Sequence, residues 1–415
     1  MRQCFFGIVL LTVTIAHAQV RPAETAPGAK PGGLKCSAVE ADGYLYLGGQ
    51  SANRPDGSVP NSFSEQAAQA LENVKTIVEA SGLTMEHVVY VQVYLEDVNN
   101  YSAFSAVLKK YFPNVPPAGA VLGVSKLPRP AIQINAVAVR DLAGRKAVIP
   151  ANYKLDEPFS PGILTHDRLF VSAMQGRDFQ SGKIADEPAT QTDLALDGLK
   201  AVAEAAGLSM KHYVFVNPYL TENISYKVMN ERYARRFEFG NTPGRATIEV
   251  TALPQQAQIE YTGVAVRDLS LRRSIRPKNM PPSPTASPCV FASATLYCSA
   301  KSGFIPGPHG GVFGHTTAAQ LRQTMRNQLD NLEEADMDFN QVVSTTIYLD
   351  DLADSAAFSK VYSEYFQDGL PVQTLVQQLP SSDRAPDADG HYPDLEQMSL
   401  IAVKNFKMTN SKACP

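Results

Sequence analysis

The sequence has little excess charge and, beyond its first residues, no long apolar run. Among 415 residues, 37 Lys and Arg stand against 41 Asp and Glu, so the net charge is −4. A nucleic-acid-binding chain needs many cations to neutralise phosphates, and we therefore expect no nucleic-acid partner. A membrane-spanning helix needs about eighteen or more consecutive apolar residues, so we also expect no membrane anchor. The absence of tryptophan excludes nothing by itself.

The sequence also lacks the usual signature of a metal centre. Its seven histidines show no ligand-like spacing with one another or with cysteine, and none of its five cysteines belongs to a C-x-x-C pair. We therefore predict no metal. Four cysteines follow the N-terminal region, and an even number permits two disulfides in three connectivities, although unpaired thiols fit equally well. They are Cys36, Cys289, Cys298 and Cys414.

The first residues predict a secretory signal peptide. A basic residue, Arg2, precedes an apolar stretch at residues 5–15, which is too short to span a bilayer. The A-x-A pattern at residues 16–18 is typical of a cleavage site. We expect cleavage after Ala18, which makes residues 1–18 the signal peptide and places the mature chain in the periplasm or outside the cell. A buried N-terminal helix is the less favoured alternative.

The chain contains three similar segments. The string VAVRDL occurs at residues 137–142 and again at 264–269, and ENVKTIVEASGLTMEHV at 72–88 matches DGLKAVAEAAGLSMKHY at 197–213. A weaker third copy lies nearer the C-terminus, after basic and then Pro-rich linker sequence at 270–288. Internal repetition at a fixed period indicates repeated structural units. We therefore predict three domains of similar construction, at residues 34–142, 155–269 and 285–407.

Each copy has the same predicted order of strands and helices. In copy one, apolar residues at i, i+4, i+7 and i+11 form one helical stripe. They are Ala67, Leu71, Val74 and Val78. Gly82 follows the last turn, where a left-handed backbone favours glycine. A strand precedes this helix, and a strand, a second helix and two further strands follow it, which predicts an α+β domain with two helices on one face of a β-sheet.

A polar stripe follows the second helix of copy two, within PGRATIEVTALP at residues 243–254. Strand alternation places Arg245, Thr247 and Glu249 on one face and the apolar residues between them on the other. A stripe of this kind fits a cleft, and it also fits a solvated sheet face.

These strings resemble the Rid (RidA/YjgF) family of reactive-intermediate imine deaminases. The resemblance covers almost all of the mature chain, and it is most specific in copy two. The matching strings there are PFSPGI (158–163), VSAMQG (171–176), PGRATIEVTALP (243–254) and IEYTGVAVRD (259–268). Family members fold like trimeric chorismate mutase and usually form homotrimers with ligand sites between subunits. The resemblance therefore implies three tandem chorismate-mutase-like domains in a single-chain pseudo-trimer that is a monomer in solution; independent domains in a row are the alternative.

The family hydrolyses 2-imino acids, or their enamine tautomers, to 2-keto acids and ammonia without a cofactor. An arginine grips the substrate carboxylate, and a glutamate positions or deprotonates the attacking water. The arginine position falls on Gly119, Arg245 and Gln373 in copies one, two and three, and the glutamate position falls on Gln133, Glu260 and Gln397. Only copy two retains both residues, so the resemblance implies one catalytic pair, Arg245 and Glu260.

Three further positions carry over as substrate-binding residues of copy two. The family's aromatic residue falls on Phe159, a pocket serine on Ser172, and a cysteine of many members on Thr247. Because the family's sites lie between subunits, the sequence leaves open which copy completes the cleft of Arg245.

Two functions follow as hypotheses. The first is an exported RidA-like deaminase that acts on a small carboxylate-bearing substrate. The second is a non-catalytic protein that keeps the fold and binds a small carboxylate or serves as a scaffold. Loss of the pair in two copies favours the second hypothesis. Export weighs against the first, because the imines that the family removes arise mostly in the cytoplasm.

Overall fold

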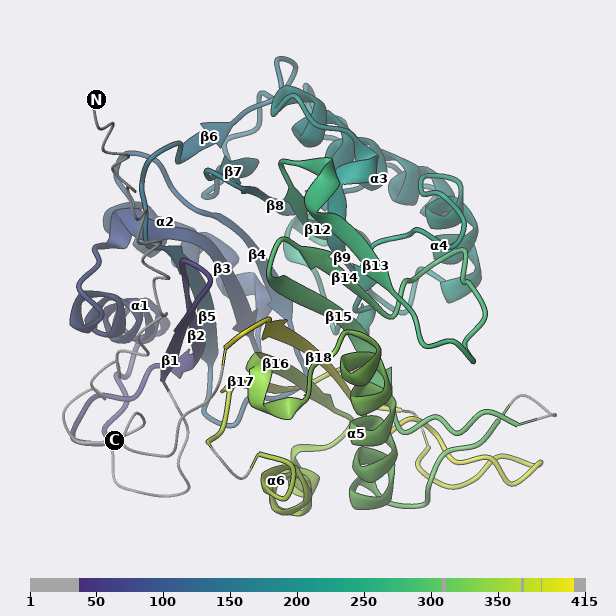
Figure 1. Ribbon diagram of the computed structural model, residues 1–415. Coiled ribbons are helices and arrows are strands. Elements are labelled where there is room, and N and C mark those ends of the chain that lie inside the picture. Colours follow the sequence, from purple (N-terminus) through teal and green to yellow (C-terminus); the bar gives the residue numbers. More distant parts are fainter. Residues whose placement is uncertain (1–36, 308–310, 367–368, 382, 407–415) are drawn as a thin grey trace, which may run out of the picture.

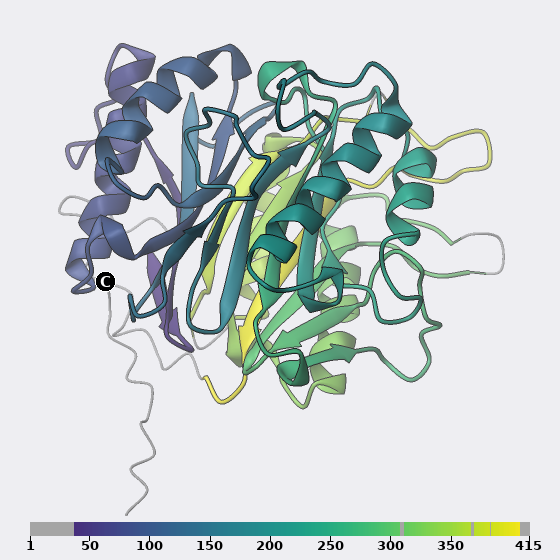
Figure 2. The ribbon, with the colours of Figure 1, turned by 90° about the horizontal axis from the view of Figure 1, so that it is seen from above.

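The computed structural model describes residues 37–307, 311–366, 369–381 and 383–406. The predicted signal peptide, Cys36 and Cys414 lie outside these ranges. The described chain forms three β-sheets that face one another at the centre, and helices cover their outer faces (Figures 1 and 2). Each sheet belongs to one copy, which confirms the predicted α+β fold. None of the helices in these ranges has the length and apolar character that a membrane crossing requires.

Copy one forms a five-stranded sheet with two helices. Along the chain its elements are β1 (Ala38–Ala41), β2 (Tyr44–Ser51), α1 (Phe63–Ala80), β3 (Val88–Leu95), α2 (Tyr101–Tyr111), β4 (Ala118–Gly123) and β5 (Ile132–Val139). The strands lie in the order β1-β2-β5-β3-β4. β3 and β4 pair in parallel, and the other neighbours are antiparallel.

Copy two repeats this sheet and splits the strand equivalent to β4. Its elements are β6 (Lys146–Val148), β7 (Gly162–Leu164), β8 (Arg168–Gln175), α3 (Pro188–Ala205), β9 (Tyr213–Leu220), α4 (Tyr226–Ala234), β10 (Gly244–Arg245), β11 (Ile248–Glu249) and β12 (Ile259–Val266). The sheet order is β10-β9-β12-β8-β7-β6, and β11 also pairs with β9. The connection between copies one and two thus contributes β6 to the sheet.

Copy three forms a six-stranded sheet. Its elements are β13 (Arg272–Ile275), β14 (Cys289–Ala292), β15 (Thr295–Ser302), α5 (Thr317–Glu334), β16 (Val342–Leu349), α6 (Ser355–Ser363), β17 (Val372–Gln377) and β18 (Glu396–Val403). The sheet order is β13-β14-β15-β18-β16-β17. β13 lies inside the predicted linker 270–288, so the basic part of that segment is an edge strand rather than a free connection.

Local sequence explains where helix α1 begins and ends. The Ser62 side chain accepts from the backbone N–H of Glu65, and the Glu65 carboxylate accepts from the backbone N–H of Ser62, which makes a capping box. Gly82 has φ +72°, as expected for a glycine that ends a helix. The predicted stripe is buried against the sheet, at Ala67, Leu71, Val74 and Val78.

The three copies pack against one another around the centre. Backbone hydrogen bonds join all three, from Gly123 N to Ala252 O (2.9 Å), from Ser125 N to Gln377 O (3.1 Å) and from Leu379 N to Glu249 O (3.1 Å). Three tyrosines at the same position of β3, β9 and β16 share one buried cluster; they are Tyr94, Tyr219 and Tyr348. The chain is therefore a pseudo-trimer, and a row of independent domains is excluded.

A buried cation also ties the copies together. Arg168, at the start of β8, has a fully buried side chain whose Nη2 lies 2.5 Å from Asp42 Oδ2 of copy one and 2.8 Å from Thr295 Oγ1 of copy three. Its Nη1 donates to the Tyr297 hydroxyl at 3.2 Å, and its Cζ lies 4.3 Å from the centre of the Tyr44 ring. A buried guanidinium is tolerated only when it is paired in this way.

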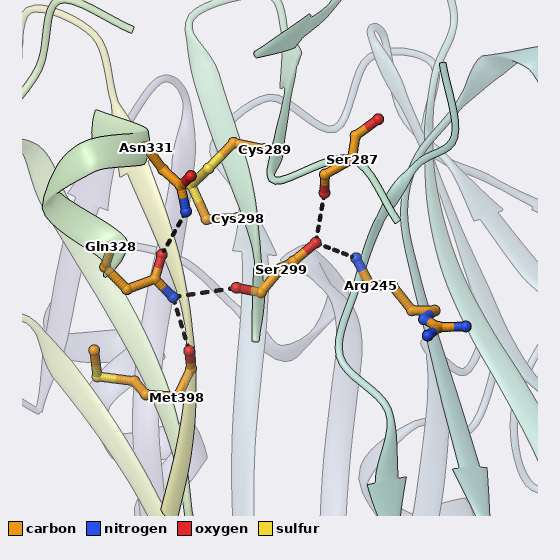
Figure 3. The surroundings of a disulfide bond; sticks show 8 residues. All are labelled: Arg245, Ser287, Cys289, Cys298, Ser299, Gln328, Asn331 and Met398. Atoms are coloured by element: carbon orange, nitrogen blue, oxygen red, sulfur yellow. Dashed lines mark hydrogen bonds between the residues drawn. A yellow bond between two sulfur atoms is a disulfide. The ribbon is translucent and has the colours of Figure 1, made fainter. Parts of the chain in front are cut away.

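Two of the cysteines form a disulfide. Cys289 in β14 and Cys298 in β15 are direct cross-strand partners and are bonded through their sulfur atoms (Figure 3). The register of β14 and β15 brings these two side chains together. The spacing of the cysteines in the sequence did not decide which of them form a disulfide.

Candidate active site

The copies meet in three equivalent clefts, which we call cleft 1/2, cleft 2/3 and cleft 3/1 after the copies that form them. In cleft 1/2, Ser172 Oγ of copy two accepts a hydrogen bond from the backbone N–H of Gly119 in copy one, at 2.8 Å. In cleft 2/3, Ser299 Oγ of copy three accepts one from the backbone N–H of Arg245 in copy two, also at 2.8 Å (Figure 3). The repeated contact shows that the arginine position of one copy faces the second strand of another.

Cleft 3/1 has neither member of the predicted pair. Gly48 takes the serine position, and a Cβ atom on it would lie 2.9 Å from the carbonyl oxygen of Gln373. Gln133 Nε2 donates to the carbonyl oxygen of Leu375 across the cleft, at 3.2 Å. These side chains are uncharged, so they provide neither a cation for a carboxylate nor a base.

Arg245 and Glu260 do not share a cleft. Glu260 lines cleft 1/2 together with Phe159, Ser172 and Gly119, whereas Arg245 lies in cleft 2/3. The reason is topological: β10 is the sheet edge beside copy three, while Glu260 pairs with β8 on the side that meets copy one. The catalytic pair expected within copy two is therefore split between two clefts.

Cleft 1/2 is closed by an aromatic ring. A Cβ atom on Gly119 would lie 2.7 Å from Phe159 Cε1, so Phe159 occupies the space where an arginine side chain would begin. The cavity that remains is about 30 Å³, which holds about one water molecule and no imino acid. The cation beside it, Arg177, is already paired with Glu157 at 2.8 Å, and Glu157 also accepts from the Tyr101 hydroxyl at 2.6 Å.

Glu260 is a buried, mostly neutral acid. Gln175 Nε2 donates to its Oε2 at 3.2 Å, and its Oε1 has no hydrogen-bond partner. Burial raises the pKa of Glu260 from 4.5 to about 8, although the bond from Gln175 and the charge of Arg177 oppose this rise. Near pH 7 the side chain therefore keeps its proton and is unsuited to act as a general base.

Cleft 2/3 contains a cation without a counter-charge. Arg245 Nη1 donates to Asn230 Oδ1 at 2.7 Å, and its Cζ lies 5.2 Å from the centre of the Tyr233 ring. Within the described ranges, no carboxylate oxygen lies within 4.0 Å of this guanidinium, and its Nε and Nη2 donate to no side chain or carbonyl. Burial lowers the pKa of Arg245, but a guanidinium remains charged at neutral pH. The free donors suit a carboxylate that binds through both oxygens.

The predicted polar stripe lines the same side of the strand as Arg245. Arg245, Thr247 and Glu249 are partly exposed, while the residues between them are buried, as alternation predicted. Thr247 Oγ1 is buried and has no hydrogen-bond partner. Burial raises the pKa of Glu249, with a contribution from Glu222. A substrate group near Arg245 would thus find an unsatisfied hydroxyl beside it.

The glutamate position of this cleft belongs to copy three and is Gln397. Gln397 lies opposite Ser302 in the β15–β18 register, just as Glu260 lies opposite Gln175 in the β8–β12 register. Its Nε2 donates to Gln378 Oε1 at 2.9 Å. An amide takes no proton from water at neutral pH, so Gln397 cannot replace the family glutamate as a base.

Sequence reasoning missed the contribution of helix α4. Tyr226, Asn230 and Tyr233 lie at i, i+4 and i+7, which is one face of a helix. Asn230 bonds the guanidinium, and the ring of Tyr233 lies beneath it. Burial raises the pKa of Tyr226, and the charge of Arg245 opposes this rise. The polar and aromatic residues at helical spacing were the signal that could have identified this face.

A central cavity and an acidic turn of the described chain differ in chemistry from cleft 2/3. A cavity of about 110 Å³ between the three sheets is lined by uncharged side chains, including the three central tyrosines. Asp387, Asp389 and His391 each have one possible metal ligand within 4.8 Å of the others. However, they lie in an exposed turn, where Asp387 accepts from the backbone N–H groups of the other two. Neither of these groups provides the guanidinium with free donors that Arg245 provides in cleft 2/3.

Known proteins match stretches of this chain that have about the length of one copy. The Endoribonuclease L-PSP family model matches residues 32–140, 151–267 and 281–381. A RutC family protein of Pyrococcus horikoshii is 36% identical over 121 residues, which are 28% of this chain and 94% of that protein. A Dermatophagoides farinae protein named 2-iminobutanoate/2-iminopropanoate deaminase is 34% identical over 113 residues, 26% of this chain and 88% of its own length. The crystal structure of the E. coli YjgF gene product, at 32% identity, covers 30% of this chain and 100% of its own, with a TM-score of 0.28.

Proposed function

Because the chain belongs to the Endoribonuclease L-PSP family, which includes the Rid (RidA/YjgF) proteins, we propose that it hydrolyses 2-imino acids or their enamine tautomers to 2-keto acids and ammonia. We assign the reaction to one site, in cleft 2/3. The observation that carries this proposal is Arg245, a partly buried cation with free donors and no carboxylate partner in the described ranges.

Substrate recognition follows from the groups around this guanidinium. Arg245 binds the substrate carboxylate through Nε and Nη2, while Asn230 and the ring of Tyr233 hold the guanidinium in place. The substrate carbon chain then lies along the strand face of Thr247, whose hydroxyl is unsatisfied. Glu260 takes no part, because it lies in cleft 1/2 and keeps its proton near pH 7.

The alternative is a protein that binds a small carboxylate without catalysis. It is favoured by the amide of Gln397, which replaces the glutamate of the family in cleft 2/3. Ribonuclease activity, which the family description names, is less favoured, because a net charge of −4 gives little attraction for RNA phosphates.

Imine clearance tests the proposal directly. An amino-acid oxidase generates 2-iminopropanoate, semicarbazide traps what remains, and purified protein competes for the imine. We expect the wild type to accelerate imine loss and Arg245→Ala to lower kcat/KM by about 30-fold or more, because loss of a charge-assisted bidentate contact costs about 2 kcal/mol or more. Arg245→Lys should recover only part of the activity, since an ammonium lacks the fork of donors. Arg235→Ala, at the exposed arginine that caps the C-terminus of helix α4, is the matched control.

Three outcomes separate the hypotheses. A wild type no faster than Arg245→Ala would overturn the hydrolase proposal. If pyruvate still bound to the wild type, and Arg245→Ala abolished that binding, the non-catalytic alternative would hold. If Glu260→Gln abolished clearance while Arg245→Ala did not, the site would be cleft 1/2.

We also propose that the chain is exported as a monomer, on the strength of the N-terminal sequence pattern and the three copies in one chain. Outside the cytoplasm, its substrate would come from an oxidase that acts on amino acids. N-terminal sequencing of the mature protein should begin after Ala18, and sedimentation should give the mass of one chain, at most 45.0 kDa. A stable assembly of three chains would contradict the monomer.

A further inference from the structure

The strand that carries Arg245 is short and has little support from its own sheet. β10 consists of Gly244 and Arg245, and it pairs with β9 through these two residues. The next backbone N–H group, that of Ala246, donates to the side chain of Asn217 at 3.2 Å. The equivalent strands of the other copies, β4 and β17, each run unbroken for 6 residues. Groups outside copy two therefore contribute more to the position of Arg245 than to that of its equivalents.

Copy three supplies this support through Ser299. The backbone N–H of Arg245 donates to Ser299 Oγ at 2.8 Å, and Ser299 Oγ in turn donates to the carbonyl oxygen of Ser287 at 2.6 Å (Figure 3). A backbone hydrogen bond from Ser287 N to Pro243 O, at 3.1 Å, joins the same two segments. The backbone of Arg245 is thus held by two segments of copy three, one at the start of β14 and one within β15.

The disulfide joins these two segments covalently. Cys298 directly precedes Ser299 in the chain, and Cys289 follows Ser287 by two positions. Both cysteines are fully buried, and their sulfur atoms are bonded across β14 and β15 (Figure 3). A covalent bond between the strands prevents them from moving apart, so the Ser287 carbonyl and the Ser299 hydroxyl keep their separation. The disulfide therefore fixes the two groups that hold the backbone of Arg245.

Helix α5 fixes Ser299 from the other side of the sheet. The register of β15 and β18 shifts between Cys298 and Lys301, so the backbone of Ser299 lies in an irregular part of the ladder. Gln328, which is fully buried on α5, donates from Nε2 to the carbonyl oxygen of Ser299 at 3.1 Å and to that of Met398 at 2.8 Å (Figure 3). Buried carbonyl groups need such partners. The Gln328 amide thus joins β15 to β18 at the irregularity and holds Ser299.

The other two copies have neither of these groups. The cross-strand pair equivalent to the two cysteines is Ala38 and Leu47 in copy one, and Gly162 and Val171 in copy two. The residue equivalent to Gln328 is Val74 in copy one and Leu199 in copy two.

Cleft 1/2 nevertheless has the same hydrogen bonds as cleft 2/3. The backbone N–H of Gly119 donates to Ser172 Oγ at 2.8 Å, and Ser172 Oγ donates to the carbonyl oxygen of Ser160 at 2.6 Å. These hydrogen bonds therefore join two copies without a disulfide. The disulfide and the buried amide are additions at the cleft that contains Arg245.

We propose that the Cys289–Cys298 disulfide and the Gln328 amide position Arg245 for its substrate, and that both act through Ser299. The inference rests on the proposed hydrolase function, and these groups are positioning residues that do not touch the substrate. A guanidinium that binds a carboxylate through both oxygens needs a fixed direction, and a site that is fixed before binding loses less entropy. Arg245 binds the carboxylate equally in the ground state and the transition state, so a less well fixed Arg245 raises KM and changes kcat little.

The decisive variant is Cys289→Ala with Cys298→Val, two residues that other copies have at these positions. Under conditions where circular dichroism shows the native fold, its affinity for pyruvate should fall by about threefold to tenfold. Its KM for imine clearance should rise by the same factor, with kcat within about twofold of the wild type. Gln328→Leu, which introduces the residue of copy two, should change affinity and KM in the same direction.

The matched control is Phe291→Leu. Phe291 lies on β14 in the same buried cluster as the cysteines, so this change removes core volume and keeps the disulfide. It should bind pyruvate like the wild type. The proposal would be overturned if the double cysteine variant and Gln328→Leu kept the wild-type affinity, or if Phe291→Leu lost as much affinity as they did.

Hydrogen–deuterium exchange tests the positioning without a ligand. In the double cysteine variant, the amides of residues 243–249 should exchange about tenfold faster or more than in the wild type, while those of residues 117–123, the equivalent segment in cleft 1/2, should be unchanged. Unchanged exchange at 243–249, or equal acceleration of both segments, would overturn the inference, since the disulfide would then have no local effect on β10. A wild type that clears no imine would overturn the hydrolase proposal; faster exchange at 243–249 alone would still support the positioning of Arg245 by the disulfide.

Discussion

Replacing Glu260 by glutamine should make the protein more stable at alkaline pH. Burial raises the pKa of Glu260 from 4.5 to about 8, so between these values the folded chain holds a proton that the unfolded chain releases. The contribution of Glu260 to the stability is therefore greatest below pH 4.5, falls as the pH rises to 8, and is constant above it. The shift corresponds to about 5 kcal/mol in total, of which about 4 kcal/mol is lost between pH 5 and pH 9. An amide does not titrate, so Glu260→Gln avoids this loss.

The assay is urea unfolding followed by circular dichroism at pH 5, 7 and 9, since the chain has no tryptophan. Gln133 already holds the equivalent position in copy one, which shows that the fold accepts an amide there. Glu260→Gln should unfold near the wild-type midpoint at pH 5 and at clearly higher urea at pH 9. Glu79→Gln, at an exposed glutamate of α1, should follow the wild type at every pH. A constant difference between Glu260→Gln and wild type across the range would refute the reasoning, because Glu260 would then be charged in the folded protein.

Two further substitutions test how the copies are joined. Arg168→Met should lower the free energy of unfolding by about 3–5 kcal/mol, because it leaves Asp42 and Asp167 beside an uncharged side chain in a buried site. A loss of less than about 1 kcal/mol would mean that this cation does not hold the copies together. Gly119→Ala should lower the free energy of unfolding by about 1–3 kcal/mol, since the new Cβ atom would lie 2.7 Å from both the Val91 carbonyl oxygen and Phe159 Cε1. If the variant unfolded at the same temperature as the wild type, cleft 1/2 would have room for a side chain.

Joining three copies in one chain allows the clefts to differ. A homotrimer repeats one interface by symmetry, so all of its sites are identical. In this chain, Phe159 closes cleft 1/2 over Gly119, while cleft 2/3 keeps the open guanidinium of Arg245. Residues of the family pattern can therefore remain at positions where they no longer meet their former partners, as Glu260 does.

The periodicity of the sequence predicted the local structure well. The spacing of Ala67, Leu71, Val74 and Val78 identified the buried face of α1, and alternation along residues 245–250 identified the face that carries Arg245. Both predictions depend only on the geometry of a helix or a strand. The two connections between the copies were harder to interpret, because β6 and β13 are short edge strands that form only when a neighbouring strand is present.

The sequence by itself determined that three related α+β units follow one another, and that only copy two has both the arginine and the glutamate of the family pattern. Only the tertiary structure decided which residues meet. Arg245 and Glu260 are fifteen positions apart, yet they lie on strands that face different neighbours, because each copy contributes its two sides to two separate clefts.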